Sequence, residues 1–147
     1  IATWVKLQDK KTGQILMVVN THFDHIGTEA RRNSALLIIE KIKEIVGTSP
    51  AILTGDFNVS EDWDAYKTIT NNEFILKDAH KVAGKRTGVD FTYHNFGKIP
   101  AEKCEKIDFI FVTPQIRVIS SSIPFSQLND TLFLSDHNPE IVELEIK

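Results

Sequence analysis

Apolar runs that end in polar side chains recur along this chain and predict most of its strands. Residues 2–8 and 14–20 form two such runs, and the polar loop between them ends at Gly13, a pattern that indicates a β-hairpin. The second run and residues 51–54 are apolar at consecutive positions, which is typical of central strands buried on both faces. Each of these two central strands delivers polar residues at its end.

A helical spacing of apolar residues replaces the strand pattern from Thr28 to Val46. Thr28 is the expected N-cap of this helix, and Gly47 is a natural stop. A second helix is expected from Ser60 to about Thr70, with the serine hydroxyl as its cap. The apolar face of the first helix consists of Ala35, Ile38, Ile39, Ile42, Ile45 and Val46.

The second half of the chain combines a long irregular region with further strands. Residues 71–104 show little periodicity, and a long irregular region in a compact domain is usually functional. Strands are expected at 107–112, from 116 to 122 and at 140–146, where apolar residues alternate in the last of them.

Composition and length describe one ordinary globular domain over residues 1–147. A net charge of −3 provides no basic excess for nucleic-acid binding, although a local cationic cleft would not be visible in this total. The single cysteine, Cys104, excludes an internal disulfide and a cysteine-based zinc site. The longest apolar run, from Ile15 to Val19, is too short to span a membrane, which predicts a soluble protein. A single cysteine is compatible with a reducing compartment, so the cytoplasm is the slightly favoured location, and a secreted bacterial protein is the alternative.

Polar residues with catalytic chemistry stand at the ends of four predicted strands. Carboxylates can hold a hard divalent cation, amide donors can bind an anion, and histidines can transfer protons. This combination suits the hydrolysis of a phosphate ester. The residues are His22, Asp56 with Asn58, Asp108, and Asp136 with His137.

Asp108 is the most informative of these residues because it is second in an otherwise apolar strand. An ionised carboxylate is costly there unless it is paired. A buried carboxylate commonly orients a histidine by accepting its ring N–H, and His137 is a candidate partner. A structural ion pair with Lys106 or Arg117 is the alternative.

The other strand-end residues also have ordinary structural interpretations. Asp56 and Asn58 are residue types that commonly form turns, since both bond their own backbone and tolerate left-handed geometry. His22 is open to a purely structural role, and residues 135–137 are compatible with a simple loop or cap.

Four segments resemble, in order and spacing, signatures of the endonuclease/exonuclease/phosphatase superfamily, which includes DNase I-like nucleases, neutral sphingomyelinases, inositol polyphosphate 5-phosphatases and deadenylases. The stretch from Thr21 to Arg31 looks like the bacterial and deadenylase-like branch. The resemblance implies an α/β (α+β) fold, a layered β-sandwich flanked by helices. The four segments are Asn20-Thr21-His22, Thr54-Gly55-Asp56-Phe57-Asn58, Lys106-Ile107-Asp108-Phe109-Ile110 and Leu134-Ser135-Asp136-His137.

The resemblance further implies a metal-dependent phosphoesterase that hydrolyses a phosphodiester or phosphomonoester by in-line attack of water. Asp136 would help to hold the cation, usually Mg²⁺ with Mn²⁺ as an alternative. Asp56 would act on the metal or on the attacking water. An in-line attack builds charge on the phosphate oxygens, which prearranged cations and N–H groups stabilise.

The remaining site residues are implied to meet the substrate. Asn58 would bond the phosphate, and His22 would contact the phosphate or the leaving group. His137, steadied by Asp108, would stabilise the pentacovalent phosphorus or transfer a proton. Further substrate-side contacts are expected from Arg31, His25, Asn95 and Trp63.

The chain also departs from the family pattern. The family fold has two similar halves, and its first half supplies an early strand-end asparagine and a metal-binding glutamate; neither motif occurs in this sequence. Residues 1–147 are therefore expected to be the C-terminal half of such a domain, weak or inactive alone and partnered by the N-terminal half. A non-catalytic fragment or binding module that retains the fold is the competing hypothesis. The substrate stays open among nucleic acids, nucleotides, sugar phosphates and lipid headgroups.

Overall fold

A computed structural model describes residues 1–147 except 73, 75, 130 and 131. Its largest sheet has the strand order β1-β2-β3-β6-β4, and a smaller sheet has the order β10-β7-β5. The strands of the first sheet are β1 (Ala2–Gln8), β2 (Ile15–His22), β3 (Ala51–Asp56), β6 (Asp108–Val112) and β4 (Lys77–Asp78). Those of the second are β10 (Ile141–Ile146), β7 (Ile116–Ile123) and β5 (Lys85–Gly88). A separate hairpin consists of β8 (Gln127–Asn129) and β9 (Leu132–Phe133).

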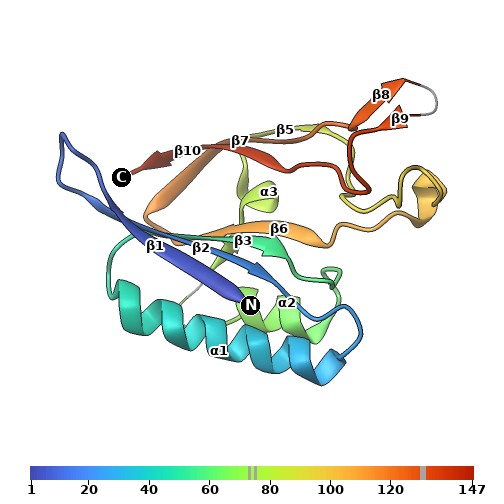
Figure 1. Ribbon diagram of the computed structural model, residues 1–147. Coiled ribbons are helices and arrows are strands. Elements are labelled where there is room, and N and C mark those ends of the chain that lie inside the picture. Colours follow the sequence, from blue (N-terminus) through green and yellow to red (C-terminus); the bar gives the residue numbers. More distant parts are fainter. Residues whose placement is uncertain (73, 75, 130–131) are drawn as a thin grey trace.

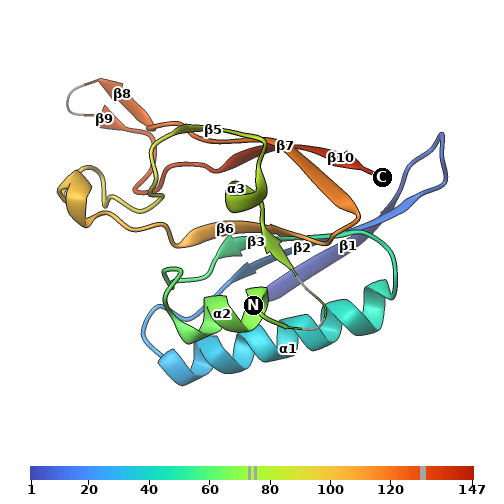
Figure 2. The ribbon, with the colours of Figure 1, turned by 180° about the vertical axis from the view of Figure 1, so that it is seen from behind.

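The helices and sheets are arranged in layers (Figures 1 and 2). The helices α1 (Thr28–Val46) and α2 (Asp64–Thr70) cover one face of the five-stranded sheet. The three-stranded sheet lies across the other face, and the short helix α3 (Ala79–Val82) lies between the two sheets. This arrangement confirms the expected layered β-sandwich with flanking helices.

Alternating side chains of the large sheet build a core on each of its faces. Val19, Leu53 and Phe111 belong to the cluster that packs against the helices. Leu16, Ile52 and Ile110 belong to the cluster between the two sheets. Because neighbouring residues on a strand point to opposite faces, the consecutive apolar positions that predicted these strands are explained by burial on both sides.

Strand register brings three polar residues into one row at an edge of the large sheet. β2 and β3 run parallel, which pairs His22 with Asp56. β3 and β6 run antiparallel, which pairs Asp56 with Asp108. Two strand ends and one strand start therefore meet at the same edge, and each carries a polar side chain there.

Gly55 allows β2 and β3 to approach closely beside this row. Its φ is +153°, and a Cβ atom built there would lie 2.0 Å from the carbonyl oxygen of Thr21. Any side chain at position 55 would collide with the backbone of the neighbouring strand. The glycine is thus required by the strand pairing itself and not merely by a turn after the strand.

Most predicted elements are confirmed, with differences at their ends. The first helix has its predicted bounds, but Gly27 occupies the N-cap position, so Thr28 is not the cap. The side chain of Asp24 instead accepts hydrogen bonds from the two backbone N–H groups that precede the helix. The second helix begins at Asp64 and not at Ser60. The described part of residues 71–104, a region expected to be irregular, contains β4, α3, β5 and a 3₁₀ turn at Ala101–Lys103.

Apolar side chains of β1 lie exposed at the edge of the large sheet. Trp4, Val5 and Leu7 are each about half exposed, at 52%, 51% and 49%. Of these three residues, Trp4 lines a groove that residues of β1, β2 and α1 form. Among the described residues, no helix is both long and apolar enough to cross a membrane.

The approach of the strands at Gly55 predicts a large loss of stability in Gly55→Ala. We expect the free energy of unfolding to fall by about 3 kcal/mol because the methyl group must displace the Thr21 backbone. Gly47→Ala is the control, since φ there is +60° but no atom lies within 4 Å of the added Cβ. That variant should lose only about 1 kcal/mol. Equal losses in urea denaturation would contradict the steric explanation.

Candidate active site

The edge of the sheet forms an open polar surface around His22 and Asp56. The Nε2 atom of His22 lies 3.5 Å from Oδ2 of Asp56, and its Nδ1 atom lies 2.8 Å from the carbonyl oxygen of Phe23. The side chain of His22 is 62% exposed, whereas that of Asp56 is 15% exposed. The imidazole of His22 is therefore accessible to a ligand, whereas the carboxylate of Asp56 lies deeper beside it.

Asp56 and Asn58 are joined by a local turn. The backbone N–H of Asn58 donates to Oδ1 of Asp56 at 2.8 Å, and Asn58 has a φ of +51°. The side chain of Asn58 donates to the carbonyl oxygen of Phe23 at 3.1 Å. The turn interpretation of these two residues is thus correct, and it coexists with their position at the polar edge.

The environment of Asp56 disfavours its ionised form. Burial raises the pKa of Asp56, and the N–H of Asn58 partly opposes this effect. The nearby carboxylate of Asp108 raises the pKa further. A carboxylate held in this way is a strong candidate for a functional role, because a cation or a transferred proton would relieve the unfavourable charge.

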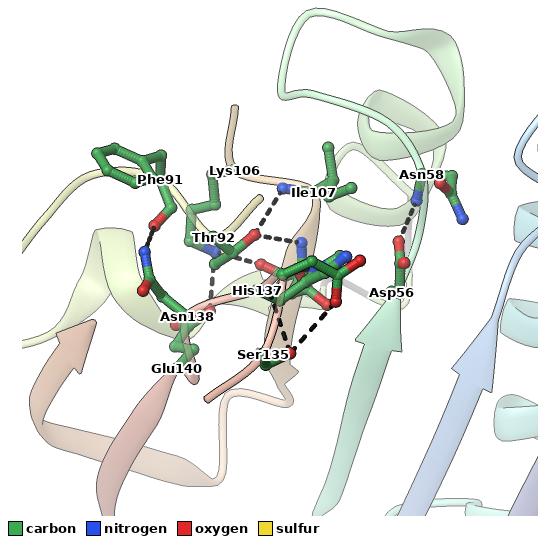
Figure 3. A network of polar contacts seen from close by, with 12 residues as sticks. Asp56, Asn58, Phe91, Thr92, Lys106, Ile107, Ser135, His137, Asn138 and Glu140 are labelled. Atoms are coloured by element: carbon green, nitrogen blue, oxygen red, sulfur yellow. Dashed lines mark hydrogen bonds and ion pairs between the residues drawn. The ribbon is translucent and has the colours of Figure 1, made fainter. Parts of the chain in front are cut away.

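Asp108 pairs with His137. The Nδ1 atom of His137 lies 2.7 Å from Oδ2 of Asp108, and Figure 3 shows the ring of His137 beside the start of β6. The alternative partners are excluded, because the side chain of Lys106 pairs with Glu140 and that of Arg117 pairs with Glu145. Because a carboxylate accepts hydrogen bonds, the contact fixes Nδ1 as the nitrogen that carries hydrogen and leaves Nε2 outside this bond.

Two buried residues that the sequence did not reveal hold the His137 loop against β6 (Figure 3). The hydroxyl oxygen of Thr92 accepts hydrogen bonds from the N–H groups of Ile107 and Asp108, both at 3.1 Å. The N–H of Asn138 donates to the carbonyl oxygen of Thr92 at 2.7 Å. Thr92 and Asn138 are 0% and 2% exposed. Only the adjacency of Asn138 to the predicted histidine could have drawn attention to it.

The candidate cation ligands differ in part from the predicted pair. Within the described part of the chain, Asp56, Asp108 and His137 offer ligand atoms that lie within 4.8 Å of one another. Asp136 lies outside this group; its side chain accepts a hydrogen bond from Ser135 at 3.3 Å, and its carbonyl oxygen accepts from the N–H groups of His94 and Asn95. Asp56 is the one residue common to the prediction and the observed group.

The predicted substrate-side residues do not all gather at this edge. Arg31 is buried, lies 5.1 Å from the ring centroid of Trp63, and lines a separate pocket with it. His25 is exposed in the loop between β2 and α1. Asn95 contacts the carbonyl oxygen of Asp136 through its backbone N–H. Only Asn58 of this set directly adjoins Asp56 and Asp108, which together with the neighbouring His22 form the row of polar residues called the carboxylate row below.

Comparison with known proteins gives consistent matches. A sequence model of the Endonuclease/Exonuclease/phosphatase family matches residues 3–137. An endonuclease/exonuclease/phosphatase from Bacteroides vulgatus is similar in structure, with a TM-score of 0.94, 63% identity and coverage of 99% of this chain and 55% of that chain. A mannosyl-6-phosphatase from Bacteroides thetaiotaomicron gives a TM-score of 0.87 at 33% identity, covering 99% of this chain and 57% of that chain.

The chain also matches about half the length of a curated relative. An uncharacterized protein from Acanthamoeba polyphaga mimivirus is 30% identical over 144 residues, which are 93% of this chain and 52% of that protein. The chain therefore spans about half the length of the relatives that it matches.

The environment of Asp56 predicts that Asp56→Asn raises the melting temperature at pH 7. The pKa of this carboxyl is higher in the folded chain than its usual value of 3.8, so its ionisation opposes folding as the pH rises. Asparagine removes the charge and keeps an oxygen for the N–H of Asn58. Thermal unfolding measured in EDTA should show the gain at pH 7 and its disappearance below pH 3.8.

Asp9→Asn provides a control of opposite sign. Hydrogen bonds from Thr12 and Lys11 lower the pKa of Asp9, so its charge stabilises the fold above pH 3.8 and this contribution fades as the pH falls through the lowered pKa. The Asp9→Asn variant should therefore melt at a lower temperature at pH 7. Melting temperatures that move in the same direction in both variants would contradict the electrostatic account.

Proposed function

The chain belongs to the endonuclease/exonuclease/phosphatase family, and we propose that it carries the phosphate-binding part of a metal-dependent phosphoesterase. The observation that supports this most strongly is the 2.7 Å contact between Asp108 and His137 beside Asp56. A carboxylate-oriented imidazole next to a second, partly desolvated carboxylate suits proton transfer during hydrolysis.

The proposed reaction is attack of water on phosphorus with cleavage of the bond to the ester oxygen. A proton leaves the attacking water, and a proton reaches the departing oxygen. Asp56 is suited to orient the attacking water or to accept a proton from it. Nε2 of His137 is suited to interact with the phosphate or to transfer a proton. His22 and Asn58 are proposed to bind the phosphate oxygens. Their N–H groups would stabilise the charge that grows there in the transition state.

A divalent cation, Mg²⁺ with Mn²⁺ as an alternative, fits the donor chemistry at this edge. Carboxylate oxygens are the ligands that Mg²⁺ prefers, and the ligand atoms of the observed group lie within 4.8 Å of one another. From this group we propose Asp56 as a ligand, since Asp108 and His137 are already bonded to each other. Asp136, which lies outside the group, is proposed as the second ligand on the family resemblance alone. A bound Mg²⁺ would neutralise charge on the phosphate and favour ionisation of a water molecule.

A phosphorylated sugar is the substrate class that we propose to test first. The similar structure from Bacteroides thetaiotaomicron is described as a mannosyl-6-phosphatase and is 33% identical to this chain. The net charge of −3 also disfavours a nuclease that tracks a nucleic-acid backbone without sequence preference.

We further propose that residues 1–147 form the C-terminal half of the catalytic domain. The coverage of 55% and 57% of the similar solved chains and the exposed apolar side chains of β1 support only the statement that the chain is part of a larger domain. That it is the C-terminal part is proposed on the family resemblance. The N-terminal half of the domain would then supply further ligands to the cation site beside Asp56 and Asp108.

The proposal predicts phosphate release by the full-length protein in Mg²⁺ that stops in EDTA. His137→Ala should lower kcat by about 100-fold or more, because general acid–base catalysis contributes about this much. Lys43→Ala is the control and should retain activity, because Lys43 is exposed in the last turn of α1, at the opposite end of the helix from the loop that follows His22. Activity that resists EDTA, or an unimpaired His137→Ala variant, would refute the mechanism. A full-length protein without activity on any phosphate ester would favour a binding module.

The domain proposal predicts a contrast between the 147-residue chain and the full-length protein. The chain alone should be at least about 100-fold less active on the best sugar phosphate, because an incompletely held site loses about that factor for small misplacements. Both proteins are compared at matched Mg²⁺ concentrations, with circular dichroism to verify that each is folded. Equal turnover would show that the chain is a complete catalytic unit.

A further inference from the structure

A buried ion pair joins two segments next to the site. The Nζ atom of Lys106 lies 2.8 Å from Oε2 of Glu140, and the two side chains are only 7% and 3% exposed. Taking two charges out of water is costly, and a buried pair often adds nothing to stability beyond what apolar residues would give. The pair therefore calls for an explanation other than stability.

The ammonium group of Lys106 touches the catalytic segment directly. It donates to the carbonyl oxygen of Asp108 at 2.9 Å and lies 3.9 Å from the centroid of the Phe109 ring. Its three neighbours, two oxygens and an aromatic face, surround it with negative potential. The start of β6, which carries Asp108, is thus fixed to the buried ammonium group.

Glu140 fixes the other segment. It follows His137 by three residues, just before β10 begins at Ile141. Its second oxygen, Oε1, lies 3.5 Å from the hydroxyl of Ser121 on β7, and that hydroxyl lies 2.8 Å from Nδ1 of His80. The carboxylate of Glu140 is therefore anchored to the second sheet and to α3. Figure 3 draws Glu140 and Lys106 in the same network of polar contacts as Thr92 and Asn138.

We propose that Lys106 and Glu140 are positioning residues that set the distance between Asp108 and His137. One ion pair connects the strand that carries the carboxylate with the loop that carries the imidazole. Both side chains are almost completely buried, at 7% and 3% exposed, and Glu140 borders the pocket that His22, Asp56 and Asp108 also line. Because their charged groups are bonded to each other, both residues act on the site through the pair. The kinetic part of this inference rests on the proposed phosphoesterase function; the geometric part does not.

The decisive variant replaces both charges with apolar residues of similar size, Lys106→Met with Glu140→Met. Such replacements of a buried pair are commonly neutral or stabilising, so the fold should persist. The ionic connection between the Asp108 segment and the His137 loop is nevertheless lost, whereas the contacts of Thr92 and Asn138 are not altered directly. Val118→Ala, a truncation in the core between the same two sheets, is the control for a general loosening of that core. All variants are made in the full-length protein.

Two readouts are measured for each variant. The first is the proton resonance of His137 Nδ1–H in the nuclear magnetic resonance spectrum, which reports the bond to Asp108 and needs no substrate. The second is the pair of constants kcat and KM for phosphate release. The double variant should lose the resonance through exchange with water, with kcat reduced by about 10-fold or more and KM nearly unchanged. Val118→Ala should retain both the resonance and kcat.

A folded double variant that retains the resonance would overturn the inference, whatever its activity. If the unaltered protein has no phosphoesterase activity, the proposed function fails, but the resonance still decides whether the pair positions His137. Glu140→Gln provides the same comparison if the double variant does not fold. It keeps the volume of the side chain and leaves Lys106 without its counter-charge, and an unchanged resonance in it would also overturn the inference.

Discussion

The carbonyl oxygen of Thr21 faces Gly55 so closely that no side chain fits between β2 and β3, and the site depends on this approach. The pairing fixes the register in which His22 lies beside Asp56. The antiparallel pairing with β6 then adds Asp108 to the same row. Because a shift of one residue would turn each side chain to the other face, the row exists only in this register. The pairing of the backbone strands therefore determines the spacing of these polar side chains, independently of the contacts among the side chains.

Contacts remote in sequence complete the row. His137 comes from the loop before β10 and reaches Asp108, while the backbone hydrogen bond from Asn138 to Thr92 joins that loop to the segment that holds the start of β6. These contacts give hydrogen-bond partners to buried and partly buried polar groups, which would be costly without them. Together with the ion pair of Lys106 and Glu140, they account for part of the buried polar residues of the domain, among them Thr92, Lys106 and Asn138.

The sequence was most informative where structure is local. The long helix kept its predicted bounds and the central strands were located correctly, because burial patterns repeat every few residues. The pairing of Asp108 with His137 was also predictable, since a carboxylate at an apolar strand position needs a partner. Thr92 was not, because its role is to accept backbone N–H groups from β6, which no side-chain pattern records. The place of Arg31 and Trp63 in a separate pocket likewise depends on helix packing between α1 and α2.

A crystal structure of the full-length protein with Mg²⁺ and inorganic phosphate would test the central claim most directly. The claim is that His22, Asn58 and His137 converge on one phosphate at the carboxylate row. The account predicts phosphate within hydrogen-bond distance of these three side chains and the cation on Asp56. Phosphate bound instead between Arg31 and Trp63, with the carboxylate row free of both ions, would contradict it.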